Sequence, residues 1–179
     1  MTGSMRLGLA PTTAQAELIE KTIDCCGMLW NRMIADEAKL KAELGRRLVP
    51  TPAKYKREFP ELKDVDSLAL NGLHHRLLGD FQNHDYNPHD YKKPEPVAQM
   101  FSYVTYSKLS KGGFTIRMED GGIRLPKLGL VSVIQSMEMP EGMTIQAATV
   151  FRENGHYFCK VKYECPAEQT AVAIEKLPA

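Results

Sequence analysis

Residues 122–133, "GIRLPKLGLVSV", decide how the second half of the chain folds. A strand-like run stops at Pro126, the chain bends through Lys127 and Gly129, and alternating apolar and small residues follow. Proline has no N–H for a sheet ladder, so it is found at strand ends and edges. The pattern predicts two strands joined by a corner whose first role is structural.

The period-two alternation continues on both sides of this stretch. Asn154-Gly155 is a strong two-residue hairpin signal, and Asp120-Gly121-Gly122 supplies another tight turn. The six strand candidates are residues 101–109, 113–119, 122–126, 130–135, 143–152 and 156–164. Short strands joined by tight turns predict a small antiparallel barrel of the OB-like kind, which is used for oligonucleotides.

Helical signals dominate the first 85 residues, after a short strand at residues 5–10. Thr12 and Gln15 have capping-box spacing, and Gly45 offers a C-cap. Between them one apolar face is predicted from Ile19, Ile23, Cys26, Trp30, Met33, Leu40 and Leu44. This spacing predicts one long helix packed by a single face.

Two further helices are predicted before residue 86. Thr51-Pro52 begins a short basic helix that ends before Pro60, and either Asp66 or Ser67 caps the next one. The buried seam of that last helix is predicted to be Leu70, Leu73, Leu77 and Phe81. Residues 84–96 hold three prolines among polar and aromatic residues, which is typical of a linker.

The order strand, helices, strands predicts the α+β class, with a helical domain inserted after the first strand of the barrel. The expected divisions are a first barrel strand at 1–12, a helical insertion at 13–85, a linker at 86–97, the β-barrel at 98–166 and a tail at 167–179.

Composition narrows the functional classes. The chain of 179 residues has a formal net charge of +1, from 23 Lys and Arg against 22 Asp and Glu, so binding to nucleic acid by bulk positive charge is not expected. The N-terminus has neither a long apolar run nor a secretory cleavage site, so we expect a cytoplasmic protein with no membrane partner. The four cysteines lack zinc-site spacing and are expected to be free thiols.

No catalytic motif rises above background. The chain lacks G-x-S-x-G, G-x-x-x-x-G-K, G-x-G-x-x-G and H-E-x-x-H. His74 and His75 are adjacent, and adjacent helical residues do not share a face. We therefore expect no catalytic centre, metal or cofactor in this segment.

A binding surface is the remaining expectation. Five cations without an intervening acid lie within residues 46–57, and they are Arg46, Arg47, Lys54, Lys56 and Arg57. A merely solvated loop is an equal alternative. Aromatic residues near lysines suggest base stacking beside phosphate contacts, with about half of the rings expected in the core. These rings are Tyr86, Tyr91, Phe101, Tyr103 and Tyr106, and the candidate lysines are Lys108, Lys111 and Lys127, together with His75 on a polar helix face.

The order of four motifs resembles one family. "RLGLAPTTAQAELIEKTIDCCGMLWNRMIADE" resembles the opening of the TnpB (OrfB) proteins of bacterial insertion sequences, which are relatives of the type V CRISPR effectors. "FPELKDVDSLALNGLHHRLLGDFQN" is similar to the family's W-L-K-x-V-x-S-x-A-L-Q helix. "IRLPKLGLVSV" and "ATVFRENGHYFCKVKYE" are similar to its I-K-L-P-K-L-G-W-V-K-V hairpin and to the strands before its nuclease domain.

The resemblance implies an OB-like wedge domain with a recognition domain inserted into it. Together these would hold guide RNA and target DNA, while a downstream RuvC-like nuclease domain in the full-length protein cuts the DNA. By position, Ser67 and Asn71 match the helix that reads the motif beside the target, and Thr105 matches a contact on the barrel's second strand. Asn71 stands where the family has Gln and keeps an amide that can read adenine.

Two other functions are compatible with the sequence. The protein could be a nuclease-less DNA-binding regulator or remnant that stands alone. It could also be a protein-interaction module with no role in nucleic-acid binding, which the near-neutral charge favours.

Overall fold

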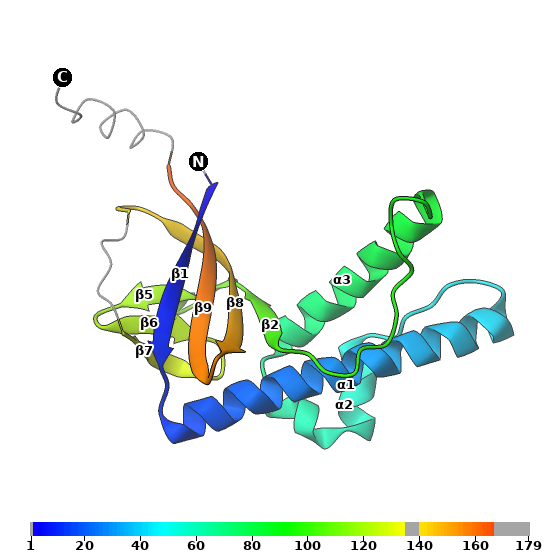
Figure 1. The fold of residues 1–179 in the computed structure, drawn as a ribbon, viewed down its shortest axis with the longest axis horizontal. Coiled ribbons are helices and arrows are strands. Elements are labelled where there is room, and N and C mark those ends of the chain that lie inside the picture. Colours follow the sequence, from blue (N-terminus) through cyan, green and yellow to red (C-terminus); the bar gives the residue numbers. More distant parts are fainter. Residues whose placement is uncertain (1, 135–139, 167–179) are drawn as a thin grey trace. The chain divides into compact units, whose positions relative to one another are not determined.

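The protein has the α+β class that the sequence predicts, as the computed structural model shows for residues 2–134 and 140–166 (Figure 1). Among these residues the helices are α1 (Thr13–Leu44), α2 (Pro52–Glu58), the 3-10 turn η1 (Pro60–Lys63) and α3 (Ser67–Tyr86). The strands are β1 (Thr2–Ala10), β2 (Ser102–Tyr106), β3 (Leu109–Ser110), β4 (Gly113–Phe114), β5 (Arg117–Glu119), β6 (Gly122–Leu125), β7 (Gly129–Val133), β8 (Thr144–Glu153) and β9 (His156–Glu164).

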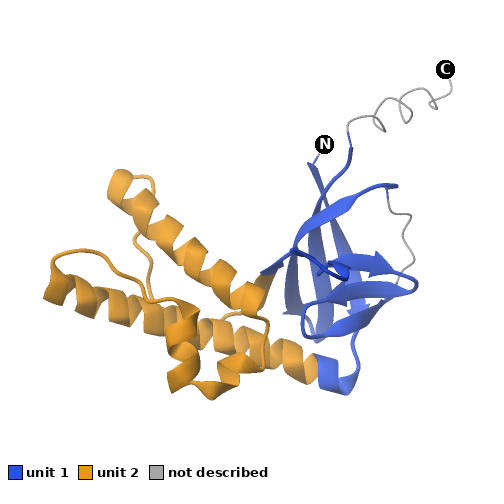
Figure 2. Ribbon diagram, turned by 180° about the vertical axis from the view of Figure 1, so that it is seen from behind, with its two compact units in different colours: residues 1–15, 105–179 blue, residues 16–104 orange. Residues whose placement is uncertain are grey.

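The chain divides into two compact units (Figure 2). The first, which we call the sheet unit, combines residues 1–15 with the described residues from 105 onward. The second, the helical unit, is residues 16–104. The sheet unit is therefore built from two segments of the chain that are far apart in sequence.

The sheet unit contains a seven-stranded antiparallel sheet in the order β2-β8-β9-β1-β7-β6-β5. β1 pairs with β9 from Thr2 to Leu9 and with β7 at Leu9 and Ala10, so one bent strand belongs to both halves of the sheet. The order runs from β2 at one edge to β5 at the other and is not closed among the described strands. The closure and OB-like character of the predicted barrel therefore stay predictions.

Both predicted hairpin turns are confirmed. Glu153 pairs with His156, and Asn154 and Gly155 between them have φ of 50° and 80°. Positive φ at both central positions is the type I′ geometry that favours Asn-Gly. Glu119 likewise pairs with Gly122 across a turn in which Gly121 has φ of 75°.

The stretch 122–133 forms the β6–β7 hairpin. Leu125 pairs with Gly129, so Pro126 ends β6 as predicted. Lys127 has φ of 65° and Gly129 has φ of 71°, which are left-handed conformations. A Cβ on Gly122 would lie 2.3 Å from the carbonyl oxygen of Val131, so only glycine fits at that position.

The strand expected at residues 113–119 is instead two short strands. β4 pairs with β3 in a separate two-stranded ribbon, and β5 belongs to the main sheet. The break falls at Thr115, whose hydroxyl accepts a hydrogen bond from the Lys108 amide at 3.0 Å. A side chain that bonds the backbone in this way competes with the ladder, which propensity alone does not reveal.

The capping box at the start of α1 is confirmed. The Gln15 amide donates to the Thr12 hydroxyl at 3.2 Å, and the Thr12 amide donates to Gln15 Oε1 at 3.0 Å. Gln15 Nε2 also donates to the Leu128 and Leu130 carbonyls at 3.0 and 2.8 Å. One side chain of the sheet unit therefore caps the first turn of α1 and also bonds the β6–β7 turn.

The buried face of α1 is shorter than predicted. Ile19, Cys26 and Met33 are buried as expected, and Gly45 ends the helix with φ of 66°. Leu40 is only half-buried and Leu44 is exposed, so the prediction that they extend the face is wrong. Glu37 is buried there instead, because it has a cationic partner described below.

The two later helices begin close to the predicted residues. Asp66, not Ser67, caps α3 by accepting a hydrogen bond from the Leu68 amide at 2.8 Å. Pro52 opens α2, but the Thr51 side chain makes no capping hydrogen bond. The α3 seam is buried as predicted at Leu70, Leu73, Leu77 and Phe81.

Candidate nucleic-acid interface

Arg47, one of the five predicted cations, is held inside the helical unit. Its Nε donates to Glu37 at 2.8 Å, and its guanidinium also bonds Asp85 and lies 4.5 Å above the Phe81 ring. Its hydrogen bond lowers the pKa of Asp85 below the ordinary value, with burial opposing the shift. Arg47 therefore joins the end of α1 to α3 and has little reach for a phosphate.

Lys56 and Ser67 are brought together although α2 and α3 are separate helices. Lys56 Nζ donates to Ser67 Oγ at 2.8 Å, next to the cap of α3. The phenol of Tyr55 is buried and donates to Asp36 at 2.9 Å, which holds α2 against α1. Burial, together with this bond, raises the pKa of Tyr55 above its ordinary value.

We call six side chains of α2 and α3 the α2–α3 surface. Lys54, Arg57, Asn71 and His75 are exposed, whereas Lys56 and Ser67 are half-buried. Ser67, Asn71 and His75 are four residues apart, so they follow one stripe along the helix. Lys54 lies 3.9 Å from Asp36 and keeps about half of its side chain exposed. Arg57 is exposed at the end of α2.

Arg46 is exposed just beyond α1, next in sequence to the buried contacts of Arg47. The structure therefore divides the predicted basic run into the internal Arg47, the half-buried Lys56 and three exposed cations, which are Arg46, Lys54 and Arg57. Sequence spacing could not make this division, because the acids that capture Arg47 lie 10 and 38 residues away.

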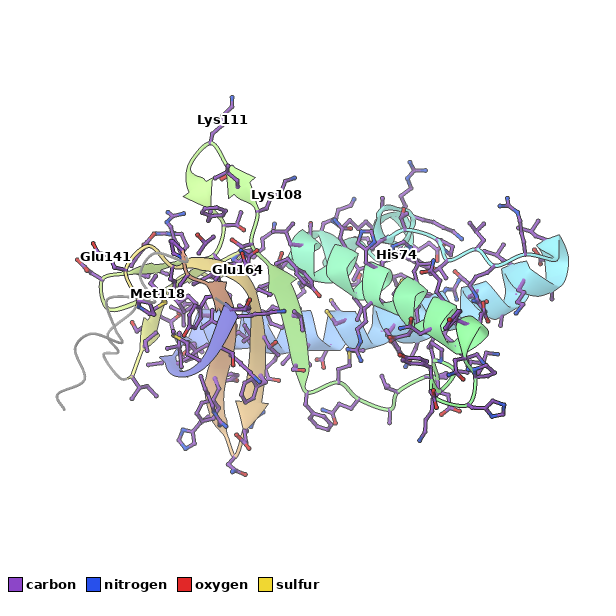
Figure 3. All side chains as sticks on the ribbon, turned by 90° about the horizontal axis from the view of Figure 1, so that it is seen from above. His74, Lys108, Lys111, Met118, Glu141 and Glu164 are labelled. Carbon is purple, nitrogen blue, oxygen red and sulfur yellow. The ribbon has the colours of Figure 1, made fainter. Side chains whose placement is uncertain are left out.

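Four predicted contacts lie in the sheet unit. Lys111 lies at the tip of the β3–β4 hairpin and Lys108 at its base, and both extend away from the sheet (Figure 3). Lys127 is exposed in the β6–β7 turn. Thr105 is fully buried, and its hydroxyl has no hydrogen-bond partner among the described residues. In this conformation Thr105 does not present its side chain to a ligand.

The aromatic residues are more exposed than predicted. Tyr103 is buried, but Tyr86, Tyr91, Phe101 and Tyr106 are exposed, so the expectation that about half of these rings lie in the core is wrong. Trp30, in contrast, is buried, and its indole N–H donates to the Glu95 carbonyl at 2.9 Å.

Residue types that can bind a metal are present among the described residues but do not form a cluster. No group of three or more His, Cys, Asp and Glu side chains within them could hold a metal ion. His74 is buried, with Nε2 3.1 Å from the Val49 carbonyl, whereas His75 is exposed. Burial raises the pKa of the Cys26 and Cys159 thiols to about 12, so neither is poised as a nucleophile.

No helix in the described parts of the chain combines the length and the apolar character that crossing a bilayer requires.

Sequence reasoning missed the outer face of β1, β9 and β8. Alternation along β9 places Phe158, Lys160 and Lys162 on the same side of the strand, opposite the buried Cys159 and Val161. The signal was present in the sequence, but only the pairing with β1 shows that Arg6 lies beside Lys160.

Comparison with known families matches residues 1–43 to the helix-turn-helix domain of IS605 OrfB proteins. These residues are therefore similar to a helix-turn-helix domain of transposon-associated proteins. The matched residues are about a quarter of the chain. The matched residues form β1 and nearly all of α1. No curated protein matches the chain.

Proposed function

We propose that this chain is the nucleic-acid-recognition segment of a transposon-encoded RNA-guided DNA endonuclease. It holds guide RNA and target DNA, and a downstream RuvC-like domain cuts. The observation that carries the proposal is the match of residues 1–43 to the helix-turn-helix domain of IS605 OrfB proteins. In this proposal the sheet unit is the OB-like wedge and the helical unit is the inserted recognition domain.

The α2–α3 surface is proposed to contact the target duplex. Lys54 and Arg57 supply positive charge for phosphates, which position a protein on DNA without reading its sequence. Asn71 is exposed between Ser67 and His75, and its amide can bond adenine through two atoms at once. The Lys56–Ser67 hydrogen bond holds the first turn of α3 against α2, so the reading helix and the phosphate contacts move together.

Cleavage is assigned elsewhere because phosphodiester hydrolysis by two metals needs several convergent carboxylates. The described residues contain no cluster of that kind. The coding frame that follows codon 179 is expected to encode a RuvC-like domain, and an immediate stop codon would instead favour a regulator without a nuclease.

The proposal is tested by titrating labelled duplex DNA with the chain at several salt concentrations. Removing two phosphate contacts in Lys54→Gln/Arg57→Gln is expected to reduce the slope of log K against log salt by about 1.8. The control is Lys39→Gln/Lys41→Gln, which removes two exposed charges from α1, outside the α2–α3 surface. Equal slopes for both double variants would overturn the assignment of this surface.

A further inference from the structure

The outer face of the sheet unit carries cations and aromatic rings in register. β9 lies between β1 and β8 (Figure 1), and all three strands are antiparallel neighbours. Leu7, Cys159 and Val150 point into the core, so their sequence neighbours point outward. This places Arg6, Phe158, Lys160 and Lys162 together on a face that sequence reasoning did not single out.

We use the word row for residues that lie opposite one another on β1, β9 and β8. In two rows of this outer face a lysine lies beside a hydroxyl side chain. In the first, Lys162 is opposite Ser4 on β1. In the second, Lys160 lies between Arg6 on β1 and Thr149 on β8. Both lysines are exposed. They are two residues apart on one strand, so their stems are about 7 Å apart along β9.

The next row is aromatic. Phe158 pairs with Phe151 on β8, and their rings are stacked with centroids 5.6 Å apart and 26° between planes. The guanidinium carbon of Arg6 lies 4.0 Å from the Phe158 centroid and 5.2 Å from that of Phe151. The opposite neighbour of Phe158 is Gly8, which adds no side chain to the row. The result is a short stack that ends in a half-exposed arginine.

Acids lie at the ends of this face. Glu153 bonds Arg6 beyond the aromatic row, and Glu164 accepts a hydrogen bond from Gln146 at 3.2 Å at the other end of β9. Between them the rows present three cations, small side chains and two rings. The centre of the face is therefore positive although the chain as a whole is nearly neutral.

We propose that the outer face of β1, β9 and β8 is a stacking site for single-stranded RNA. Lys160 and Lys162 contact successive phosphates, and a base stacks on the Arg6–Phe158–Phe151 stack. The charge of the face suits a polyanion, and unpaired bases stack on aromatic rings or on arginine planes. Ser4 and Thr149, beside the lysines, supply hydroxyls for the ribose 2′-OH, by which proteins distinguish RNA from DNA.

The ion pair of Arg6 with Glu153 fits this role. It holds the guanidinium near Phe158, with its carbon 4.0 Å from the ring centroid, and the Arg6 side chain remains about half exposed. A duplex cannot use such a stack, because its bases are already stacked on each other. Contacts of a duplex with this face would therefore be limited to the lysines, and they would not depend on the Phe158 ring.

The inference rests on the proposed function only in assigning the chain a nucleic-acid partner, because it concerns the sheet unit and not the α2–α3 surface. The DNA contact of the α2–α3 surface and the RNA site on the sheet unit can therefore be disproved independently of each other. The substitutions Lys54→Gln/Arg57→Gln test duplex DNA, whereas substitutions on β9 test a single-stranded RNA.

The experiment measures the anisotropy of a labelled 12-nucleotide unstructured RNA and of the DNA strand with the same sequence. Phe158→Leu keeps an apolar side chain but removes the ring, and it is expected to weaken RNA binding by roughly fivefold or more. Phe158→Trp keeps a stacking surface and is expected to bind at least as well as the wild type. Duplex DNA binding is expected to change less than twofold in both variants.

The proposed phosphate contacts of Lys160 and Lys162 are tested by removing their charges. Lys160→Gln/Lys162→Gln is expected to lower the slope of log K against log salt for the RNA by about 1.4. Lys39→Gln/Lys41→Gln removes two exposed charges that are two residues apart on α1 and is expected to leave that slope unchanged. Equal loss in the two double variants, or equal binding by Phe158→Leu and wild type, would overturn the site. Tighter binding of the DNA strand than of the RNA would overturn the choice of RNA.

Discussion

The Asn31 side chain on α1 bonds both backbone groups of Val97. Asn31 Nδ2 donates to the Val97 carbonyl at 2.8 Å, and the Val97 amide donates to Asn31 Oδ1 at 2.8 Å. The neighbouring Trp30 bonds Glu95, and Pro94 is buried. Of the residues predicted to be a linker, 84–86 belong to the end of α3, whereas 87–97 have no regular secondary structure and are held along α1 by two adjacent side chains. Trp30 and Asn31 of α1 therefore have a structural role, because they hold the backbone of Glu95 and Val97 along the helix.

Replacing Asn31 tests that structural role. Asn31→Ala removes two hydrogen bonds and leaves the Val97 groups without partners, so we expect the free energy of unfolding to fall by about 1–3 kcal/mol. Hydrogen exchange at Val97 should accelerate at the same time. Asn71→Ala, which truncates an exposed asparagine on α3, is the control and should change stability by less than about 0.5 kcal/mol. Unchanged exchange at Val97 would show that Asn31 does not fix this segment.

Position 15, at the start of α1, is expected to favour glutamine over glutamate. Glutamate would keep the acceptor for the Thr12 amide and would suit the N-terminus of a helix. It could not donate to the Leu128 and Leu130 carbonyls, which would then face a negative charge. We expect Gln15→Glu and Gln15→Ala each to lower the free energy of unfolding by about 1–3 kcal/mol. Chemical denaturation measures this, and a Gln15→Glu protein as stable as the wild type would contradict it.

The Arg47–Asp85 pair predicts a specific loss of stability in acid. Its hydrogen bond lowers the pKa of Asp85 below the ordinary 3.8. A carboxylate with a lowered folded pKa stabilises the fold above its unfolded pKa, and that contribution is lost as pH falls through the folded value. The difference in melting temperature between wild type and Asp85→Asn should therefore be present at pH 6 and shrink below about pH 4. Asp24→Asn, on the exposed surface of α1, is the control. A difference that stays constant to pH 2.5 would contradict this role.

The four cysteine thiols should react with a disulfide reagent at different rates. Burial raises the pKa of Cys26 and Cys159 to about 12 and that of Cys25 above its ordinary value, whereas Cys165 is half-buried. At pH 8 a disulfide reagent is expected to label one thiol quickly in the native protein and all four after denaturation. Cys165→Ser should remove the fast phase. A fast phase that survives this substitution would show that a buried thiol is accessible.

Local signals predicted much of the fold. The Thr12–Gln15 capping box, the Asn154-Gly155 turn and the end of β6 at Pro126 each depend on neighbouring residues, and each was found where it was predicted. The α3 seam also followed from spacing alone. Such features are set by backbone geometry and by helix periodicity, which are readable from sequence.

Features that depend on distant pairing could not be predicted in this way. The burial of Glu37 needs Arg47, and the capture of Arg47 needs Asp85 on another helix. The β3–β4 ribbon needs Thr115 to bond the Lys108 amide. The outer face of the sheet needs the register of β1 against β9, two strands separated by about 150 residues. In each case the partner, not the local pattern, decides the role of the residue.

Contact between the α2–α3 surface and target DNA would alter hydrogen exchange, which is measured with and without duplex DNA. We expect slower exchange in the peptides that span 52–58 and 67–76 when DNA is bound, and loss of this protection in Lys54→Gln/Arg57→Gln. Protection confined to other parts of the chain, or equal protection in the double variant, would contradict it.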